Sequence, residues 1–335
     1  MDLAQRFSTL AGMITGYWIS QMVHVAARLS LADRLADGPR SVEDLAAASG
    51  VQPHALMRLL RALASVGLFR ETEPGSFGNS ELSEGLRRDV PESQWAFAVM
   101  MGGDHYDSWA GLLECVRTGD PAFERRQGMP IFEYLDRNPE SAALFDEAMT
   151  AIHGRETRET VQGFDFREIN VLADVGGGNG SNLEGILQYY PEMHGVLFDL
   201  PKVAARARER LRGSEVAERC QFVGGDFFVE IPVNADAYLL RHILHDWDDR
   251  RAGKILENLR TTMPLDARIL VVEHVIPEGD APSFGKLLDL NMLVVPGGLE
   301  RTEREFDRLF ADCGFKLTRV VPIAGDLGVV EAVPV

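Results

Sequence analysis

Apolar residues recur at helical spacing through most of the first hundred positions. They are dense between residues 16 and 35, and a helix this apolar has to bury its surface, for example against a second subunit. Ser41 predicts the N-cap of a further helix that ends at Gly50, and Pro53 predicts the start of the next one. A short hairpin around Gly75 would follow. This order of helix, turn, helix and hairpin is typical of a winged helix.

The pattern changes after Gly163. Before it, from about residue 92, the chain is mainly helical with scattered aromatic residues. After it, short apolar runs alternate with helical segments, and the last two runs would pair as a terminal hairpin. The predicted strands are residues 171–175, 195–199, 220–223, 237–240, 269–273, 316–321 and 328–333. Such alternation predicts an α/β fold with a doubly wound, Rossmann-like parallel sheet.

These patterns divide the chain into three parts. We expect residues 1–95 to be a helical, winged-helix domain suited to dimerisation, residues 96–163 a helical connection that contributes to a ligand pocket, and residues 164–335 a cofactor-binding domain. The three cysteines are far apart, so neither a disulfide framework nor a metal site of the CxxC type is indicated. No membrane-spanning run and no basic-then-apolar leader is present, and a reducing cytoplasmic setting is expected.

A glycine-rich segment, residues 174–180, follows the first predicted strand and leads into a helix. This is where a doubly wound sheet binds a nucleotide. The segment lacks GxGxxG spacing, and Asp174 at the strand end would be unfavourable beside a pyrophosphate. A cofactor with an amino-acid moiety and a sulfonium fits better. Asp199 then suits ribose hydroxyls, and Asp226 with Phe227 suits an adenine, although a plain glycine turn with strand-end caps is the alternative.

The sequence resembles the small-molecule, plant-type O-methyltransferases, including bacterial members that act on antibiotic and other secondary-metabolite precursors. The resemblance runs over almost the whole chain and rests on motifs that occur in the expected order. These motifs are residues 174–180 (DVGGGNG), 198–201 (FDLP), 225–228 (GDFF), 241–247 (RHILHDW) and 297–302 (GGLERT). The resemblance implies S-adenosylmethionine as cofactor, S-adenosylhomocysteine as product, no metal, and a homodimer formed through the N-terminal domain.

It also implies a cofactor site and a catalytic base. The cofactor residues would be Asp174, Gly176, Gly178, Asp199, Leu200, Gly225, Asp226, Phe227, Arg241 and Trp247. Arg241 stands where plant members have lysine, so it keeps the charge but changes the shape. His245 is similar to the family's catalytic base, and Glu273 and Glu300 match the two acids that hold it.

Methyl transfer to an aromatic hydroxyl is assisted by a base, and His245 is the candidate for that base. An aromatic hydroxyl with a pKa of about 10 is mostly protonated at neutral pH, so a base assists its attack on the sulfonium methyl. His245 and Glu273 follow the fourth and fifth strands and would open on the same sheet edge as the glycine loop. The alternative is that Asp246 simply caps a helix and His245 packs. His242 is expected to pack in either case.

The acceptor pocket is harder to locate, since its residues come from variable helical segments. The candidates are Trp109, Phe145, Met149, His153, Asn291 and Met292. Each of them is also an ordinary core residue in the simpler interpretation. Methionines around a flat ring would supply soft, adaptable contacts.

Three other functions compete with O-methylation. A winged-helix DNA-binding regulator is disfavoured because the chain carries 34 basic and 51 acidic residues, a net charge of −17, and lacks a basic stripe. N-methylation and a hydroxylase-like reaction occur on the same fold. The intact His245-Asp246-Trp247 segment favours O-methylation over both.

Overall fold

The computed structural model describes residues 1–335, which divide into two compact units. One unit contains residues 1–110 and 135–152, and the other contains residues 111–134 and 153–335. The segment 96–163, expected to connect two domains, contributes residues to both units. Helices α10 (Ile131–Arg137) and α11 (Pro139–Gly163) likewise contain residues of both.

The first unit is built from helices and one small sheet. Its elements are α1 (Leu3–Arg28), α2 (Leu31–Arg34), β1 (Arg40–Ser41), α3 (Val42–Ser49), α4 (Pro53–Ser65), β2 (Phe69–Glu73), β3 (Ser76–Asn79), α5 (Glu81–Glu84), α6 (Trp95–Met100) and α7 (Tyr106–Trp109). The Ser41 side chain accepts a hydrogen bond from the Asp44 amide, and Gly50 ends α3 in the left-handed conformation. The predicted caps are therefore confirmed, while the hairpin and β1 add a three-stranded sheet, in the order β1-β3-β2, to a domain expected to be helical.

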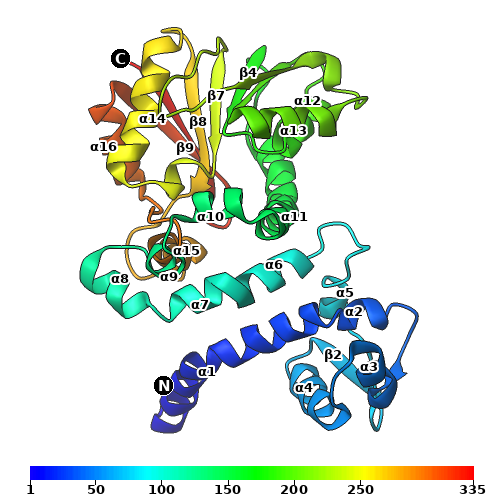
Figure 1. The fold of residues 1–335 in the computed structure, drawn as a ribbon. Helices are drawn as coiled ribbons and strands as arrows, with labels where there is room; N and C mark the ends of the chain where they lie inside the picture. Colours follow the sequence, from blue (N-terminus) through cyan, green and yellow to red (C-terminus); the bar gives the residue numbers. More distant parts are fainter. The chain divides into compact units, whose positions relative to one another are not determined.

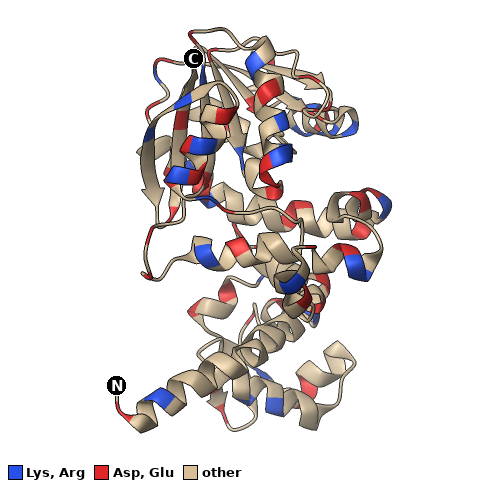
Figure 2. Cartoon of the chain, turned by 90° about the vertical axis from the view of Figure 1, so that its left-hand side faces the viewer, with Lys and Arg blue, Asp and Glu red and all other residues tan.

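Helix α1 begins at Leu3, well before the apolar stretch that predicted it. Arg6 and Arg28 are its only charged residues, so it is almost entirely tan in Figure 2. Several of its apolar side chains are at least half exposed, namely Leu3, Phe7, Leu10, Met13, Ile14, Tyr17 and Trp18. The N-terminal half of α1 thus presents an apolar surface that its own chain leaves uncovered.

The second unit contains a seven-stranded sheet. Its strands are β4 (Val171–Val175), β5 (His194–Asp199), β6 (Cys220–Gly224), β7 (Ala237–Arg241), β8 (Arg268–His274), β9 (Phe315–Ala324) and β10 (Leu327–Pro334). Their order is β6-β5-β4-β7-β8-β10-β9. The first five strands pair in parallel, and β10 pairs antiparallel with both β8 and β9. All seven predicted strands and the terminal hairpin are confirmed.

Helices cover both faces of this sheet (Figure 1). Helices α12 (Ser181–Tyr189) and α13 (Pro201–Leu211) pack their apolar residues into one core, with Leu183 and Ala207 fully buried. Helices α14 (Asp249–Thr262) and α16 (Glu303–Asp312) form the opposite core. The same unit contains α8 (Leu112–Thr118), α9 (Ala122–Gln127) and α15 (Phe284–Val294). Two buried faces explain why the strands are almost continuously apolar.

The chain reverses its direction of winding beside β4, because β5 lies on one side of that strand and β7 on the other. A crevice opens at such a switch point, outside the carboxyl ends of the strands. The loops after β4, β5, β6, β7 and β8 all leave from this edge. No helix of the chain combines the length and the apolar character that a membrane crossing requires.

Candidate active site

The glycine loop after β4 is held against the end of β5. The Gly178 amide donates to Asp199 Oδ2 at 2.8 Å, and the Leu200 amide donates to Asp199 Oδ1 at 2.7 Å. Gly176 has a φ of 74°, and a Cβ there would collide with the Ile243 side chain. Only glycine therefore allows this loop to pass so close to the chain that follows β7. The structure brings these predicted cofactor residues together.

Three buried polar atoms beside the loop have no hydrogen-bond partner within 3.5 Å, namely Asp174 Oδ2, Asn182 Nδ2 and Arg241 Nε, although the Asn182 amide is near enough to Asp174 to oppose the rise of its pKa. One is an acceptor and two are donors. An α-amino acid group carries an ammonium that donates and a carboxylate that accepts, so this set complements the methionine portion of S-adenosylmethionine. Burial raises the pKa of Asp174 to about 7, which a neighbouring ammonium would counteract. The residues present thus fit the predicted cofactor.

Arg241 is mainly engaged within the protein. Its guanidinium donates to Thr157 Oγ1 at 2.6 Å, to Asn182 Oδ1 at 2.7 Å and to Glu156 Oε2 at 2.9 Å. It also donates to the His153 carbonyl at 2.7 Å. The side chain therefore ties α11 to the ends of β7 and α12, and only Nε remains for a ligand. Thr157, Glu156 and Asn182 were missed in the sequence because no strand end or motif marks them.

Several aromatic side chains pack around Trp247. The Trp247 ring contacts Phe228 edge-to-face, with centroids 4.8 Å apart, and Phe227 at 6.2 Å. Phe132 packs on Trp247 at 5.6 Å. Asp226 accepts a hydrogen bond from the Phe228 amide at 2.8 Å, and a Cβ on Gly225 would collide with the Phe198 ring. Flat apolar faces beside a carboxylate suit an adenine, and the roles of Asp226, Phe227 and Trp247 stay predictions.

His245 stands in a short turn directly after β7, and its side chain is almost completely buried. Its Nδ1 lies 2.7 Å from Glu300 Oε1, while Nε2 lies 3.7 Å from Asp246 Oδ1. Because the Glu300 carboxylate accepts the Nδ1 proton, Nε2 is the nitrogen left to exchange a proton with a ligand. Helix α14 is capped by Asp248, not by Asp246, so the alternative that Asp246 starts the helix is wrong.

Glu273, at the end of β8, holds the backbone of this turn. Its Oε1 accepts hydrogen bonds from the Ile243 amide at 3.1 Å and the His245 amide at 3.0 Å. The second acid expected to hold the imidazole thus acts on the main chain that carries it. Its other oxygen, and that of Glu300, are buried without partners.

Electrostatics favours a proton on His245. Burial lowers the pKa of this imidazole, but Glu300, Asp246 and Glu273 outweigh that effect and raise the pKa to about 10. Burial in turn raises the pKa of Asp246 to about 6 and also raises that of Glu273. A histidine with a pKa near that of a phenol is a strong base once its proton has left.

A buried arginine fixes the segments that carry the imidazole and its acid. Arg301 is fully buried and donates to the Leu244 carbonyl at 3.0 Å and to the Trp247 carbonyl at 3.0 Å. It also pairs with Asp249 at 2.9 Å. The Leu299 amide donates to the His245 carbonyl at 2.9 Å, where a Cβ on Gly298 would collide. Arg301 was not singled out from the sequence, although it adjoins Glu300 in the last motif.

The acceptor candidates fall into two groups. Trp109, Phe145 and Met149 belong to the first compact unit, and His153, Asn291 and Met292 belong to the second. Met292 is buried on α15, and the His153 ring stacks on His242 with centroids 4.7 Å apart. His153 thus lies beside a residue that precedes His245 by three positions. The acceptor roles of all six remain predictions.

Comparison with known proteins gives consistent matches over the whole chain. Residues 109–316 match the model of an O-methyltransferase domain, and residues 11–89 match that of an O-methyltransferase dimerisation domain. The chain is 47% identical to the phenazine O-methyltransferase PhzM of Lysobacter antibioticus, over 98% of this chain and 96% of that protein. It is 38% identical to the 8-amino-8-demethylriboflavin N,N-dimethyltransferase of Streptomyces davaonensis, over 92% of this chain and 90% of that protein. The solved structure of CalO1, a methyltransferase in calicheamicin biosynthesis in its SAH-bound form, superposes with a TM-score of 0.86, at 35% identity and full coverage of both chains.

Proposed function

The chain belongs to the O-methyltransferase family and is an S-adenosylmethionine-dependent methyltransferase, and from this premise we propose that it methylates a hydroxyl group on a small aromatic acceptor. The observation that carries the proposal is the buried His245–Glu300 pair beside the cofactor loop. Aromatic natural products are the substrates that the names of several relatives indicate, including a naphthoate and an aminohydroxybenzoate. An acceptor of this secondary-metabolite kind is therefore part of the proposal.

The mechanism follows from the geometry of His245. Glu300 accepts the Nδ1 proton, so the ring is held with Nε2 available to take the proton of the acceptor hydroxyl. The bound cofactor supplies an electrophilic methyl group on a sulfonium. As the hydroxyl proton moves to Nε2, Glu300 stabilises the resulting imidazolium, and Glu273 keeps the turn in place through two backbone amides. Orientation within such a site is worth about 7–11 kcal/mol, and the base adds about 10²–10⁴-fold.

N-methylation is the second candidate, because the related flavin enzyme is named as an N,N-dimethyltransferase. An aromatic amine already has a free lone pair and needs no base before it attacks. The retention of a base whose pKa matches that of a phenol therefore favours oxygen as the nucleophile.

Incubation with paired acceptors tests the proposal. 2-Naphthol and 2-naphthylamine are each mixed with the protein and S-adenosylmethionine, and the products are followed by mass spectrometry. We expect methylation of the naphthol and little or none of the amine. Preferential methylation of the amine would replace the proposal by the second candidate, while turnover of neither, with S-adenosylhomocysteine shown to bind, would remove the aromatic hydroxyl as the acceptor class.

The protonation of His245 gives a second prediction. In the cofactor-free protein, titration by NMR should give a pKa of about 10, because three carboxyl groups outweigh the effect of burial. Glu300→Gln removes the strongest of these and should bring the pKa near or below the ordinary value of about 6.5. Since only the neutral ring is a base, kcat/KM of the wild type should rise with pH from 7 towards 10. The exposed Glu303→Gln change is the control; an unshifted pKa in Glu300→Gln would contradict the assignment.

The exposed surface of α1 predicts a homodimer in solution. A matching dimerisation domain and an uncovered apolar helix support a twofold assembly through residues 1–95. We expect light scattering to give a dimer at micromolar concentration and the double variant Leu10→Asp/Ile14→Asp to give a monomer. Val229→Asp, at an equally exposed apolar position of the second unit, should stay dimeric. A monomeric wild type would contradict this prediction.

The proposed setting is the cytoplasm. Cys115, Cys220 and Cys313 are all free thiols, which is the state that a reducing compartment maintains.

A further inference from the structure

Four imidazoles gather at the edge of the sheet, with His242 at their centre. Its ring stacks on His153, with centroids 4.7 Å apart, and lies 5.0 Å from the ring of His245 and 5.9 Å from that of His274. His242 directly follows β7 and has a φ of 50°, a left-handed conformation that few non-glycine residues adopt and that histidine adopts more often than most. Residues in such conformations cluster at functional sites, which makes His242 worth considering.

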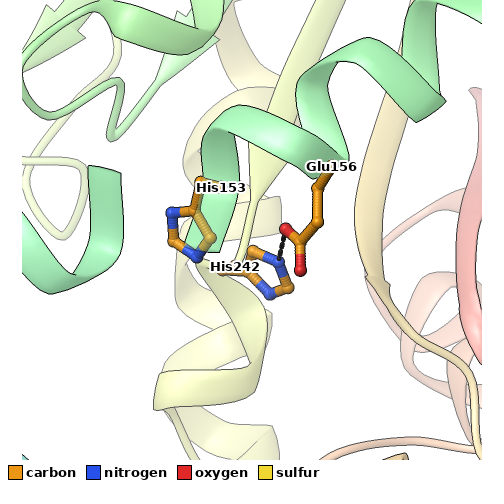
Figure 3. A group of neighbouring side chains, drawn as sticks. All are labelled: His153, Glu156 and His242. Carbon is orange, nitrogen blue, oxygen red and sulfur yellow. Dashed lines mark hydrogen bonds and ion pairs between the residues drawn. The ribbon is translucent and has the colours of Figure 1, made fainter. Parts of the chain in front are cut away.

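The hydrogen bonds of His242 fix which of its nitrogens carries the proton. Nε2 lies 2.9 Å from Glu156 Oε2, as Figure 3 shows. Burial raises the pKa of Glu156, but the hydrogen bond from His242 and the positive charge of Arg241 hold the pKa below its ordinary range, so this carboxyl group is ionised. Burial keeps the pKa of His242 below its usual value, so the ring is neutral at neutral pH. A neutral imidazole that donates from Nε2 to a carboxylate has an unprotonated Nδ1.

The unprotonated Nδ1 of His242 is buried and has no hydrogen-bond partner. A buried acceptor without a donor is unfavourable, so such an atom usually finds a partner in water or a ligand. Near the site Glu273 Oε2 and Glu300 Oε2 are also unpaired, although other unpaired atoms, such as Ser49 Oγ and Ser214 Oγ, lie elsewhere in the chain. The missing partner of Nδ1 and its position beside His245 together make it a candidate acceptor for a ligand donor.

His153, Glu156 and His242 also form a set of two imidazoles and a carboxylate, whose ligand atoms lie within 4.8 Å of one another. A divalent cation is nevertheless a poor occupant. Arg241 donates to Glu156 Oε2, the same oxygen that receives the His242 proton, at 2.9 Å. A cation on this oxygen would stand beside a fixed positive charge and would displace two existing hydrogen bonds.

We propose that Glu156 and His242 form a second carboxylate–imidazole pair, which accepts a hydrogen bond from a second hydroxyl or amino group of the aromatic acceptor, next to the hydroxyl that is methylated. The proposal rests on the function proposed above and specifies its substrate class. The rings of His242 and His245 are 5.0 Å apart, so two substituents on adjacent positions of one aromatic ring can each reach one imidazole.

The pair makes a chemical distinction among acceptors. A neighbouring hydroxyl or amino group donates a hydrogen bond to Nδ1. A fluorine, methoxy or carboxylate group at the same position has no proton to donate, so its lone pairs would face the lone pair of Nδ1. One hydrogen bond gained or lost corresponds to about a three- to tenfold change in affinity. Glu156, one turn along α11 from His153, is therefore a positioning residue, because it fixes which nitrogen of His242 carries the proton.

Calorimetry on the full chain saturated with S-adenosylhomocysteine tests this, since binding is then measured without methyl transfer. The probes are 3-amino-2-naphthol, which carries a donor, and 3-fluoro-2-naphthol, which is of similar size and carries none. We expect the amino compound to bind about three- to tenfold more tightly to the wild type. Glu156→Gln would not serve, because its amide oxygen can still accept from both Arg241 and His242. In Glu156→Leu the acceptor of the Nε2 proton is removed, so the tautomer is no longer fixed and the preference should vanish.

Glu159→Gln, one turn further on the same helix, replaces an acid that pairs with exposed Arg155 and is the matched control. It should keep the wild-type preference. NMR of ¹⁵N-labelled protein reads the tautomer of His242 directly and should show Nε2–H in the wild type and a mixture of tautomers in Glu156→Leu. Equal affinities for the two probes, a preference that survives in Glu156→Leu, or Nδ1–H in the wild type would overturn the proposal, as would a preference abolished by added zinc and restored by a chelator. Failure of O-methylation with the binding preference intact would count against the proposed function alone.

Discussion

Replacement of His245 by alanine is expected to lower kcat/KM for an aromatic hydroxyl by about 10²–10⁴-fold, the usual contribution of a positioned base. The acceptor hydroxyl then has no imidazole to take its proton. Glu300, which lies 2.7 Å from the Nδ1 atom of His245 in the wild type, would face the space that the ring occupied. The loss should fall mainly on kcat, since the base acts in the transition state. Steady-state kinetics with a series of naphthols would measure it.

Cofactor binding separates this effect from misfolding. Calorimetry should show S-adenosylhomocysteine bound by His245→Ala about as tightly as by the wild type, because the buried polar atoms that fit the cofactor belong to Asp174, Asn182 and Arg241. His194→Ala, which changes an exposed histidine at the opposite end of β5, should leave both quantities unaltered. Turnover of His245→Ala at the rate of this control would refute the role of the base.

The second large effect is on stability. Arg301→Ala should lower the free energy of unfolding by about 3–5 kcal/mol, as expected when one partner of a buried charged network is removed. The change leaves the Leu244 and Trp247 carbonyls without their donor and opens a cavity. Denaturant unfolding followed by circular dichroism would show a lower midpoint.

Arg301→Lys tests whether geometry or charge matters. A lysine ammonium cannot reproduce the planar fork that reaches two carbonyls and Asp249, so we expect most of the stability loss to remain. Arg304→Ala, on the exposed side of α16, should change stability by less than about 0.5 kcal/mol. A loss in Arg301→Ala no larger than in Arg304→Ala would show that the buried network contributes little.

The fold was predictable because its signals are local. The parallel strands are mostly apolar runs of about five residues that lie between helices. Short apolar runs in this arrangement are typical of strands in a sheet that is covered on both faces. The start of α1 was missed since its first turns are apolar without being buried, and periodicity alone does not mark where a helix with an uncovered surface begins.

The functional residues of the candidate site were predictable where they lie at the ends of strands. Asp174 and Asp199 lie at the ends of β4 and β5, and His245 follows β7, so they converge because parallel strands end at one edge. Glu156, Asn182 and Arg301 reach the same place from helices and a loop, at positions that depend on packing between segments far apart in the sequence. The sequence did not show whether Glu273 would contact the ring or the backbone of His245, because that depends on the three-dimensional path of the turn.

The position of β10 has a consequence for how the protein is made. This strand follows both β8 and β9 in the sequence, yet it lies between them and pairs through Gly328 with Glu273. The apolar edge of β8 therefore stays unpaired until β10 has been synthesised, and an unpaired edge can recruit strands from other chains. The sheet of the second unit is complete only once β10 has inserted between two strands that precede it.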